Sequence, residues 1–359
     1  MPDPLVSKVP VAVLGTGSSL PSLTLTNDDL LRRAAAHIPS GRMALAGKLA
    51  RKMGIEQRHV SRDLAHAVEA PRAEDTAPKL AARALRAALT VARTEVEHIQ
   101  FLIGHTATPH TPLPSNISWV ADELGYAGAH TELRQACTGF AAAAFMASPM
   151  IAAGNAPIAI VGSETGSVML DQAQVDADPG QVVNLVQMGD GAGAVLLGPV
   201  TSANQSRIEM MYYGSQGLGR APGLTIRATG SGSPALIASA VPHFHHDYAA
   251  IAVHGMELLR SGIQAAARAG FTRESIDWWI PHQVNGRIAE LCAAAFGLPE
   301  ERVLCEATNL GNLGSAAIWV AFDRLRRSGR LKRGQRVLVL GAEATKYLYG
   351  GFVYVHGDD

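Results

Sequence analysis

Short β-branched runs alternate with Ala-rich helical stretches along most of the 359 residues. This alternation predicts an α/β fold with a parallel or mixed sheet, because crossovers between such strands cover the sheet with helices. The clearest helix is expected over 76–93, where leucines and alanines recur at helical spacing behind Asp75 or Thr76 as N-cap, with Pro78 in the first turn. Strands are expected at 9–14, 99–103, 156–161, 192–197, 249–254, 278–280 and 336–340.

The apolar pattern lapses near the middle of the chain, at 201–206 (TSANQS). Such a lapse predicts a join between two halves of similar length, an N-terminal half over 1–200 and a C-terminal half over 201–359. Residues 209–247 are rich in Gly, Ser, Tyr and His and have no sustained periodicity. We therefore expect a long excursion there, between a strand and the next helix.

The charge balance excludes several kinds of partner. Lys+Arg and Asp+Glu are both 31, so no net field attracts the chain to nucleic acid or an anionic membrane.

No signal-peptide core and no stretch of about 18 uncharged apolar residues is present. Three cysteines without a CxxC pair form neither a disulfide framework nor a four-ligand zinc site. We expect a soluble, cytoplasmic protein that binds no nucleic acid and no membrane.

Basic residues gather between 28 and 62 despite the neutral total. They include Arg51, Lys52 and Arg58. Such a cluster is either a solvated helix face or a rim that binds anions. Both interpretations place these side chains on the surface.

Cys137 lies in the stretch QACTGF, directly before the alanines of 141–144, so a helix is expected to begin there. Unpaired backbone N–H groups and the helix dipole favour a thiolate at such a position, and we expect them to lower the Cys137 pKa. The thiolate is the nucleophilic form. The alternative is a small buried apolar side chain, which is also the simplest interpretation of Cys292 and Cys305.

Two further polar residues occupy corners of the predicted fold. His282 follows the strand-like 278–280, where ligands bind at the end of an α/β sheet, and its imidazole can exchange protons there. Asn312 lies in the small-residue turn GNLGSAA, which indicates close approach by a backbone or a substrate. Each residue alone also fits an ordinary structural role, as a satisfied histidine or a turn asparagine.

Seven stretches in the same order resemble β-ketoacyl-ACP synthase III of the thiolase superfamily, and they span most of the chain. They are MGIEQRHV (53–60), ACTGF (136–140), Glu164 after IVGS, GDGAGAVLL (189–197), PHQVNGRI (281–288), GNLGSAA (311–317) and SGRLKRGQRVLVLG (328–341).

The resemblance implies a layered α-β-α-β-α sandwich of two similar five-stranded halves. It also implies that Cys137 accepts an acyl group from CoA or acyl carrier protein, and that His282 and Asn312 lie above it. A malonyl-type donor would then lose CO2, and the two side chains would stabilise the enolate by hydrogen bonds. Such a ping-pong scheme needs one nucleophile and no metal or resident cofactor, because the CoA and phosphopantetheine thioesters are substrates.

The resemblance further implies binding residues and a homodimer. Phe140 and Asn285 lie in matched motifs and are expected to contact substrate. Arg58 is the expected anchor for CoA phosphates or the acidic carrier. The segment 105–120 would reach the neighbouring subunit.

The chain departs from the family at two places. Where the family has a Gly-rich turn that brings a backbone N–H to the acyl oxygen, this chain has 343–347 (EATKY), so the donors would be the N–H groups of Cys137 and Thr345. Leu113 stands where housekeeping enzymes have a bulky aromatic, which indicates a longer or branched acyl group. Both departures favour a specialised pathway relative over the enzyme that initiates fatty-acid synthesis.

The same site allows other reactions. The acyl group could pass to a hydroxyl or an amine, or two acyl-CoAs could condense without loss of CO2. A degenerate, non-enzymatic partner subunit is indicated only if Cys137 fails to accept an acyl group.

Other classes of protein share single features with the chain. Cys, His and Asn in this order also occur in papain-like proteases, but the C-G-S-C-W context is absent. Gly15-Thr16-Gly17 begins a dinucleotide fingerprint, but Leu20 stands where its third glycine belongs, so NAD is not expected. The histidines at 243, 245 and 246 have no nearby cysteine and indicate a solvated loop rather than a metal site.

Overall fold

The computed structural model describes residues 3–175, 178, 180–227 and 243–358. Its main sheet has ten strands, and apart from β1 the strands of each sequence half are neighbours in it. The order is β12-β13-β14-β9-β2-β8-β7-β5-β6, with β1 paired to β9. The bounds are β1 Leu5–Ser7, β2 Val11–Ser19, β5 Phe101–His105, β6 His130–Leu133, β7 Ile158–Glu164, β8 Gly191–Gly198, β9 Arg207–Ser215, β12 Trp278–Pro281, β13 Arg336–Glu343 and β14 Leu348–Val355.

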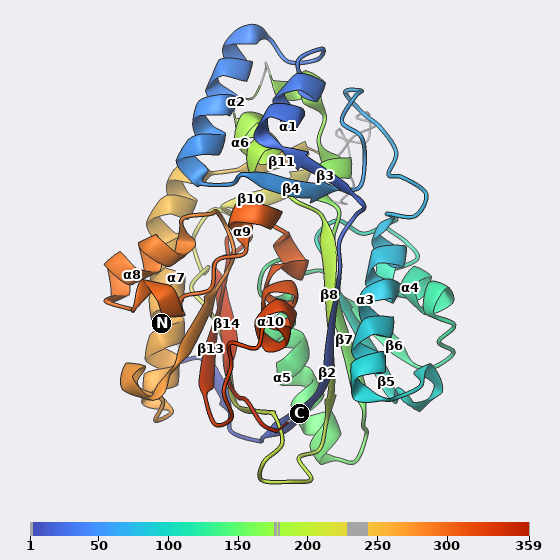
Figure 1. The fold of residues 1–359 in the computed structure, drawn as a ribbon, viewed down its shortest axis with the longest axis vertical. Helices are drawn as coiled ribbons and strands as arrows, with labels where there is room; N and C mark the ends of the chain where they lie inside the picture. Colours follow the sequence, from blue (N-terminus) through green and yellow to red (C-terminus); the bar gives the residue numbers. More distant parts are fainter. Residues whose placement is uncertain (1–2, 176–177, 179, 228–242, 359) are drawn as a thin grey trace.

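Helices lie between and outside the two groups of strands (Figure 1). Two central helices separate the groups, and a pair of helices covers each outer face, which gives the expected α-β-α-β-α sandwich. The central helices are α5 Gly139–Ala152 and α10 Ala317–Arg327, and the outer ones are α3 Ala77–Ala92, α4 Asn116–Leu124, α7 Tyr248–Arg268 and α8 Ile288–Phe296. The connection 199–206, which contains the expected join, links β8 to β9.

Smaller elements form a cap over one end of the sandwich (Figure 1). Their apolar side chains share a core of their own, with Leu30, Val60, Val182 and Phe244 buried in it. The cap therefore folds over the end of the sheet at which β12 and β13 finish. It comprises α1 Asn27–Ala34, α2 Ser40–Met53, α6 Gly180–Gln187, the pair β3 Leu23–Thr26 and β4 Gln57–Val60, and the pair β10 Leu224–Arg227 and β11 His243–His246, while the short α9 spans Ala307–Leu310.

Aromatic rings fill the space between the two groups of strands. Phe140 of α5 packs edge-on against Trp319 of α10, with ring centroids 5.7 Å apart, and against Phe352 of β14 at 6.0 Å. All three side chains are fully buried. This packing fixes α5, and hence the residues at its start, relative to the second half.

The helix expected over 76–93 is confirmed as α3, with Thr76 as N-cap and Pro78 in its first turn. The strand expected at 249–254 is wrong, because these residues belong to α7. Asp247 caps this helix by accepting a hydrogen bond from the Ala250 N–H at 3.0 Å, and the Ala-rich pattern continues for 21 residues, too long for a strand.

The expected excursion over 209–247 is also wrong over its first residues. Residues 207–215 form β9, a central strand in which Met210, Met211 and Tyr212 are successively buried. A strand covered on both faces does not alternate apolar and polar residues, so the sequence pattern does not reveal it as a strand. Residues 228–242 lie outside the described residues. Within the described ranges, no helix is both long and apolar enough to cross a membrane.

Candidate active site

Cys137 lies two residues before α5 begins, as expected. The next residue, Thr138, is the N-cap, and its N–H and its Oγ1 hydroxyl both donate to the Glu343 carboxylate, at 2.9 and 2.6 Å. Glu343 ends β13, so the second half of the chain holds the turn that positions Cys137.

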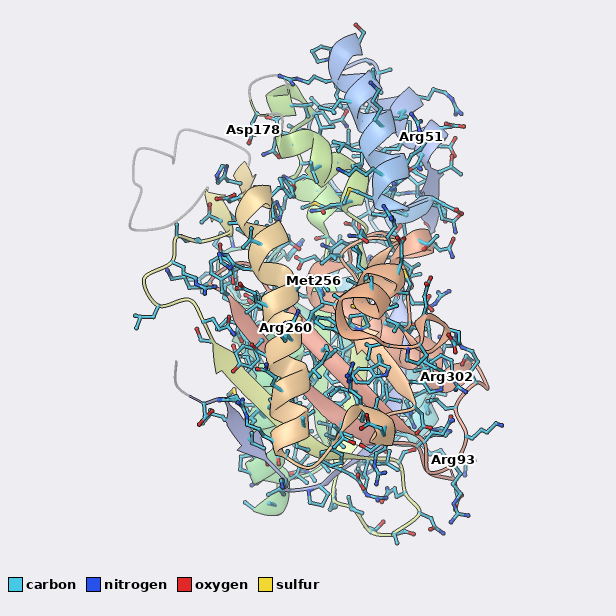
Figure 2. The ribbon with its side chains drawn as sticks, turned by 90° about the vertical axis from the view of Figure 1, so that its left-hand side faces the viewer. Arg51, Arg93, Asp178, Met256, Arg260 and Arg302 are labelled. Carbon is cyan, nitrogen blue, oxygen red and sulfur yellow. The ribbon has the colours of Figure 1, made fainter. Side chains whose placement is uncertain are left out.

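Cys137, His282 and Asn312 line one cavity of about 750 Å³. Three residues far apart in sequence thus meet at one space, as the resemblance implies. Most of the remaining wall is apolar and comes from α7, α8 and the cap, including Met53, Phe244, Met256, Leu259, Ile288 and Leu291. Figure 2 shows α7 and α8 on the outer face of the molecule, with Met256 on α7.

His282 follows β12 directly and is fixed by its backbone. Its N–H donates to the Leu340 carbonyl of β13 at 2.8 Å, and its own carbonyl accepts from the Val284 N–H at 3.1 Å. The side chain is 3% exposed, and Nδ1 is buried without a hydrogen-bond partner. Burial lowers the pKa of His282 to about 4, so the imidazole is neutral at pH 7.

Asn312 is held by the first half of the chain. Its N–H donates to the Gln187 carbonyl at 2.7 Å, and its carbonyl accepts from the Gly189 N–H at 3.1 Å. A side chain at Gly189 would collide with the Leu310 carbonyl, so only glycine permits this approach. The Asn312 Oδ1 atom accepts from the Gly314 N–H at 3.0 Å, which leaves Nδ2 to donate hydrogen bonds.

The expectation of a lowered Cys137 pKa is wrong. Burial raises the pKa of the Cys137 thiol well above its ordinary value, and the negative charges of Glu343 and Glu164 raise it further. The favourable backbone environment at the start of α5 is outweighed. Cys137 is therefore a neutral thiol at rest.

Glu164 ends β7 and lines the cavity beside Cys137. Its carboxylate accepts from the Thr108 hydroxyl, and from the N–H and hydroxyl of Ser315 at 3.0 and 2.8 Å. Burial raises the pKa of Glu164, and these hydrogen bonds oppose that effect. The contact with Ser315 links the first half to the turn that contains Asn312.

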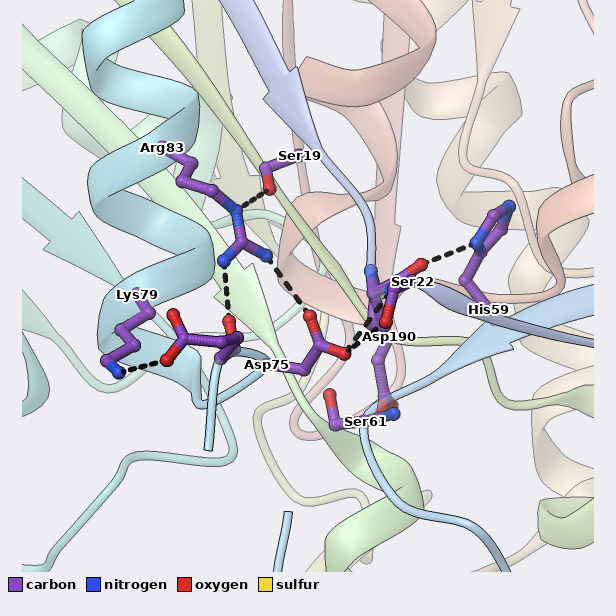
Figure 3. A network of polar contacts seen from close by, with 10 residues as sticks. Ser19, Ser22, His59, Ser61, Asp75, Lys79, Arg83 and Asp190 are labelled. Atoms are coloured by element: carbon purple, nitrogen blue, oxygen red, sulfur yellow. Dashed lines mark hydrogen bonds and ion pairs between the residues drawn. The ribbon is translucent and has the colours of Figure 1, made fainter. Parts of the chain in front are cut away.

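The second residue of the GDGAG motif, Asp190, is a buried carboxylate that does not line the cavity. Asp190 accepts from the Ser61 N–H at 2.7 Å and from the Ser167 N–H at 3.0 Å, and its own N–H donates to the His59 carbonyl at 2.8 Å. Figure 3 shows this contact region beside the network in which Arg83 and Asp75 join α3 to the end of β2. The motif therefore joins the cap to the sheet.

The expected binding residues separate into two groups. Asn285 lines the cavity, whereas Phe140 is part of the central aromatic core and does not line it. Leu113 is 85% exposed in the loop before α4, away from the cavity. Its expected role in a neighbouring subunit stays a prediction.

The expectation of Arg58 on a surface rim is wrong. Its side chain is fully buried, and Nη2 donates to Asn27 Oδ1 at 2.8 Å and to the Val186 carbonyl at 2.9 Å. Burial lowers its pKa to about 10. Arg62 is buried as well, so the basic stretch 28–62 is not one solvated face.

In the turn between β13 and β14, Ala344 lines the cavity and Thr345 does not, and the Thr345 hydroxyl donates to Glu343. The expected role of the Thr345 backbone N–H stays a prediction. Glu343 itself was missed as a functional candidate. The signal in the sequence was a charged residue at a position where the family has a Gly-rich turn. The residues after it show no apolar pattern that would explain its burial.

Two alternative interpretations lack support from the geometry. Gly15 and Gly17 lie in β2, where an added Cβ would meet the α3 backbone at Ala88 and Ala84, so they serve helix packing. Across the part of the chain that the structure describes, no group of three or more His, Cys, Asp or Glu residues could hold a metal ion.

Comparison with known families gives two matches along the chain. The model for 3-oxoacyl-[acyl-carrier-protein] synthase III matches residues 131–217, and the model for its C-terminal part matches 266–353. The β-ketoacyl-[acyl-carrier-protein] synthase III of Methylococcus capsulatus is 31% identical over 341 residues, which cover 91% of this chain and 93% of that protein.

Solved structures share the fold over nearly the whole chain. AbyA1, a tetronic acid condensing enzyme, superposes with a TM-score of 0.79 at 26% identity, covering 96% of this chain and 99% of its own. The synthase III of Pseudomonas aeruginosa gives 0.77 at 26% identity, covering 97% and 98%. OleA of Xanthomonas campestris, solved with lauric acid and lauroyl-CoA, gives 0.80 at 20% identity, covering 97% and 100%. The chain therefore belongs to the β-ketoacyl-[acyl-carrier-protein] synthase III family of condensing acyltransferases.

Proposed function

We propose that the enzyme loads an acyl group from CoA or acyl carrier protein onto Cys137 and condenses it with a malonyl-type thioester by decarboxylative Claisen chemistry. The observation that supports this proposal is the shared cavity, which Cys137, His282 and Asn312 all line. A nucleophile and two side chains that can donate hydrogen bonds, at one mostly apolar cavity, meet the needs of both half-reactions.

In the loading step, the Cys137 sulfur attacks the thioester carbon while its proton passes to His282. The imidazole can accept this proton because it is neutral at pH 7. Burial, which lowers its pKa to about 4, also makes it a weak base, so the proton moves only as the sulfur bonds to the thioester carbon. The bond between the acyl carbon and the departing thiolate breaks, and that thiolate takes the proton from His282. The acyl group is then bound to Cys137 as a neutral thioester.

In the condensing step, the malonyl-type donor loses CO2, and negative charge develops on its thioester oxygen. His282 and Asn312 Nδ2 donate hydrogen bonds to that oxygen, where the charge exists only in the transition state and intermediate. The carbanion attacks the acyl carbon, the bond to Cys137 breaks, and one proton taken up from solvent restores the thiol. The backbone N–H of Cys137, with a second donor from the β13–β14 turn, would bind the acyl oxygen.

The thioester arm is proposed to reach Cys137 along the apolar cavity. Met53, the last residue of α2, lines this cavity, and the exposed Arg51 and Lys52 precede it. Figure 2 shows Arg51 on α2. Arg51 and Lys52 belong to the part of the expected basic stretch that remains on the surface, which also includes Arg32 and Lys48. They suit an acidic carrier protein or the phosphates of CoA.

A homodimer is proposed as the working assembly. The strand β6 is the last in the sheet order, and its outer edge has no strand partner among the described residues. Leu113, which is exposed in the single chain, would then approach the acyl end of the partner subunit's cavity.

Measurement of CO2 tests the condensing step. The enzyme is first loaded with an acyl-CoA, freed of excess substrate and mixed with malonyl-CoA or malonyl carrier protein labelled in the free carboxyl group. We expect one equivalent of labelled CO2 per acyl-enzyme consumed. Consumption of the acyl-enzyme by a hydroxyl, an amine or a second acyl-CoA without labelled CO2 would establish one of the alternative reactions instead.

A further inference from the structure

Glu343 is a buried carboxylate next to the nucleophile that the proposed steps do not use. Its side chain is 1% exposed. It accepts two hydrogen bonds from Thr138, through the N–H and the Oγ1 hydroxyl, and one from the Thr345 hydroxyl. Thr138 directly follows Cys137, so these bonds fix the turn on which the sulfur lies.

Among the described residues, all hydrogen bonds to the Glu343 carboxylate come from uncharged donors. No ion pair to Glu343 occurs within the described ranges of the chain. A buried charge without a counter-ion acts strongly on its neighbours, because little water screens it. The Cys137 thiol is one of the groups on which this charge acts.

The other titratable groups around Cys137 do not cancel this charge. Glu164 of β7 is the second carboxylate that acts on the thiol. His282, after β12, and His105 of β5 are both neutral at pH 7, because burial lowers their pKa values to about 4 and about 3. Tyr213 of β9 also stays neutral, since burial raises its pKa.

We infer that Glu343 is a positioning residue for Cys137: it fixes the turn that holds the sulfur and, by its negative charge, further disfavours the thiolate form of the resting nucleophile. The inference deepens the proposed function, in that it assumes Cys137 to be the acyl acceptor. A neutral thiol resists oxidation and alkylation. The Cys137 proton would leave the sulfur only during attack on a thioester bound in the cavity. The Gly-rich turn of the resembling family has no such charge.

The test is the pH dependence of Cys137 alkylation by iodoacetamide, followed by peptide mapping. In Glu343→Gln, the shape and one set of hydrogen-bond acceptors remain while the charge is lost. We expect the inflection of the rate to move toward acid by about one pH unit or more, and the rate at pH 7 to rise about tenfold. The matched control is Asp323→Asn, at a fully buried carboxylate that binds Thr16 and Ser18, and it should leave the inflection unchanged.

Glu343→Asp separates charge from position. It keeps the charge and shortens the reach to Thr138, so the inflection should stay near that of the parent while acyl loading slows. If Glu343→Gln does not fold, as judged by circular dichroism, Glu343→Gly provides the uncharged variant.

An uncharged, folded variant with the parent inflection would overturn the inference, as would an equal shift in Glu343→Asp. Alkylation requires no acyl substrate. A failure of the proposed acyl loading would therefore be seen separately, as a parent enzyme that alkylates at Cys137 but accepts no acyl group.

Discussion

Cys137 and the pair His282 and Asn312 face one cavity but are held in different ways. Cys137, the proposed nucleophile, lies beside two buried carboxylates; burial raises its pKa most, and the charges of Glu343 and Glu164 raise it further. His282 and Asn312 are fixed through backbone hydrogen bonds, with no charged side chain bonded to either within the described residues. Under the proposed function, the difference means that the site disfavours charge on the nucleophile and preorganises donors for charge that develops later on the substrate.

Removal of the nucleophile should have the largest effect. Cys137→Ala removes the only cysteine among the described residues that line the cavity with His282 and Asn312. We expect product formation to fall by about 10⁴-fold or more, because no other side chain there can form the acyl thioester. Turnover with purified thioesters checks this, with Cys292→Ala as the matched control at a buried cysteine. Product formation at the parent rate in Cys137→Ala would remove the nucleophile from the account.

Loss of a donor should affect condensation more than loading. In Asn312→Ala, the enolate loses one hydrogen bond, and we expect condensation to slow by about 10²- to 10³-fold while the acyl-enzyme still forms. His282→Ala should slow both steps, since His282 also accepts the thiol proton. Single-turnover measurements of loading and of acyl-enzyme decay separate the two steps. Equal losses in both steps for Asn312→Ala would contradict the separation of the two regions.

The pH dependence of loading follows from the two pKa shifts. The His282 pKa is lowered to about 4, so the imidazole accepts a proton above that pH and loses this ability as the pH falls through 4. The Cys137 pKa is raised, so thiolate forms only in alkaline solution. We expect a loading rate that is flat from about pH 5 to 8 and rises at higher pH. An inflection near pH 6 to 7 would indicate a thiolate and imidazolium pair instead.

A plug in the cavity should have a smaller effect. Gly255 of α7 lines the cavity, and an added Cβ would have no protein atom within 4 Å. Gly255→Leu should fold normally, because leucine has a higher helix propensity than glycine. The variant should lower kcat/KM for long thioesters by about tenfold. Ala267→Leu, on the exposed part of the same helix, is the control. Unchanged kinetics in the plugged variant would place the substrate path elsewhere.

Charge reversal at the rim should have the smallest effect. Arg51→Glu with Lys52→Glu should raise the KM for carrier-bound substrate by about threefold and leave loading by small thioesters unchanged, since exposed charges act mainly on encounter. A salt series of the kinetics checks the electrostatic origin. An unaltered KM for carrier would exclude this surface.

The sequence predicted the layered fold and the three residues at the cavity, because strand and helix periods are local and the motifs occur in order. It did not predict β9 or α7, since a fully buried strand lacks alternation and an Ala-rich run fits either state. It also misplaced Arg58 and misjudged the Cys137 pKa. Burial and the approach of Glu343 from 206 residues away are tertiary properties, which no local pattern at Cys137 records.

The central claim is that Cys137 accepts the acyl group, and peptide mapping of the acyl-loaded enzyme tests it most directly. After incubation with an acyl-CoA series, digestion and mass spectrometry should find the acyl mass on the peptide that contains Cys137. Cys292, whose pKa burial raises to about 12, and Cys305 serve as internal controls and should stay unmodified. An acyl group on either of these cysteines, or turnover without any covalent acyl-enzyme, would contradict the account.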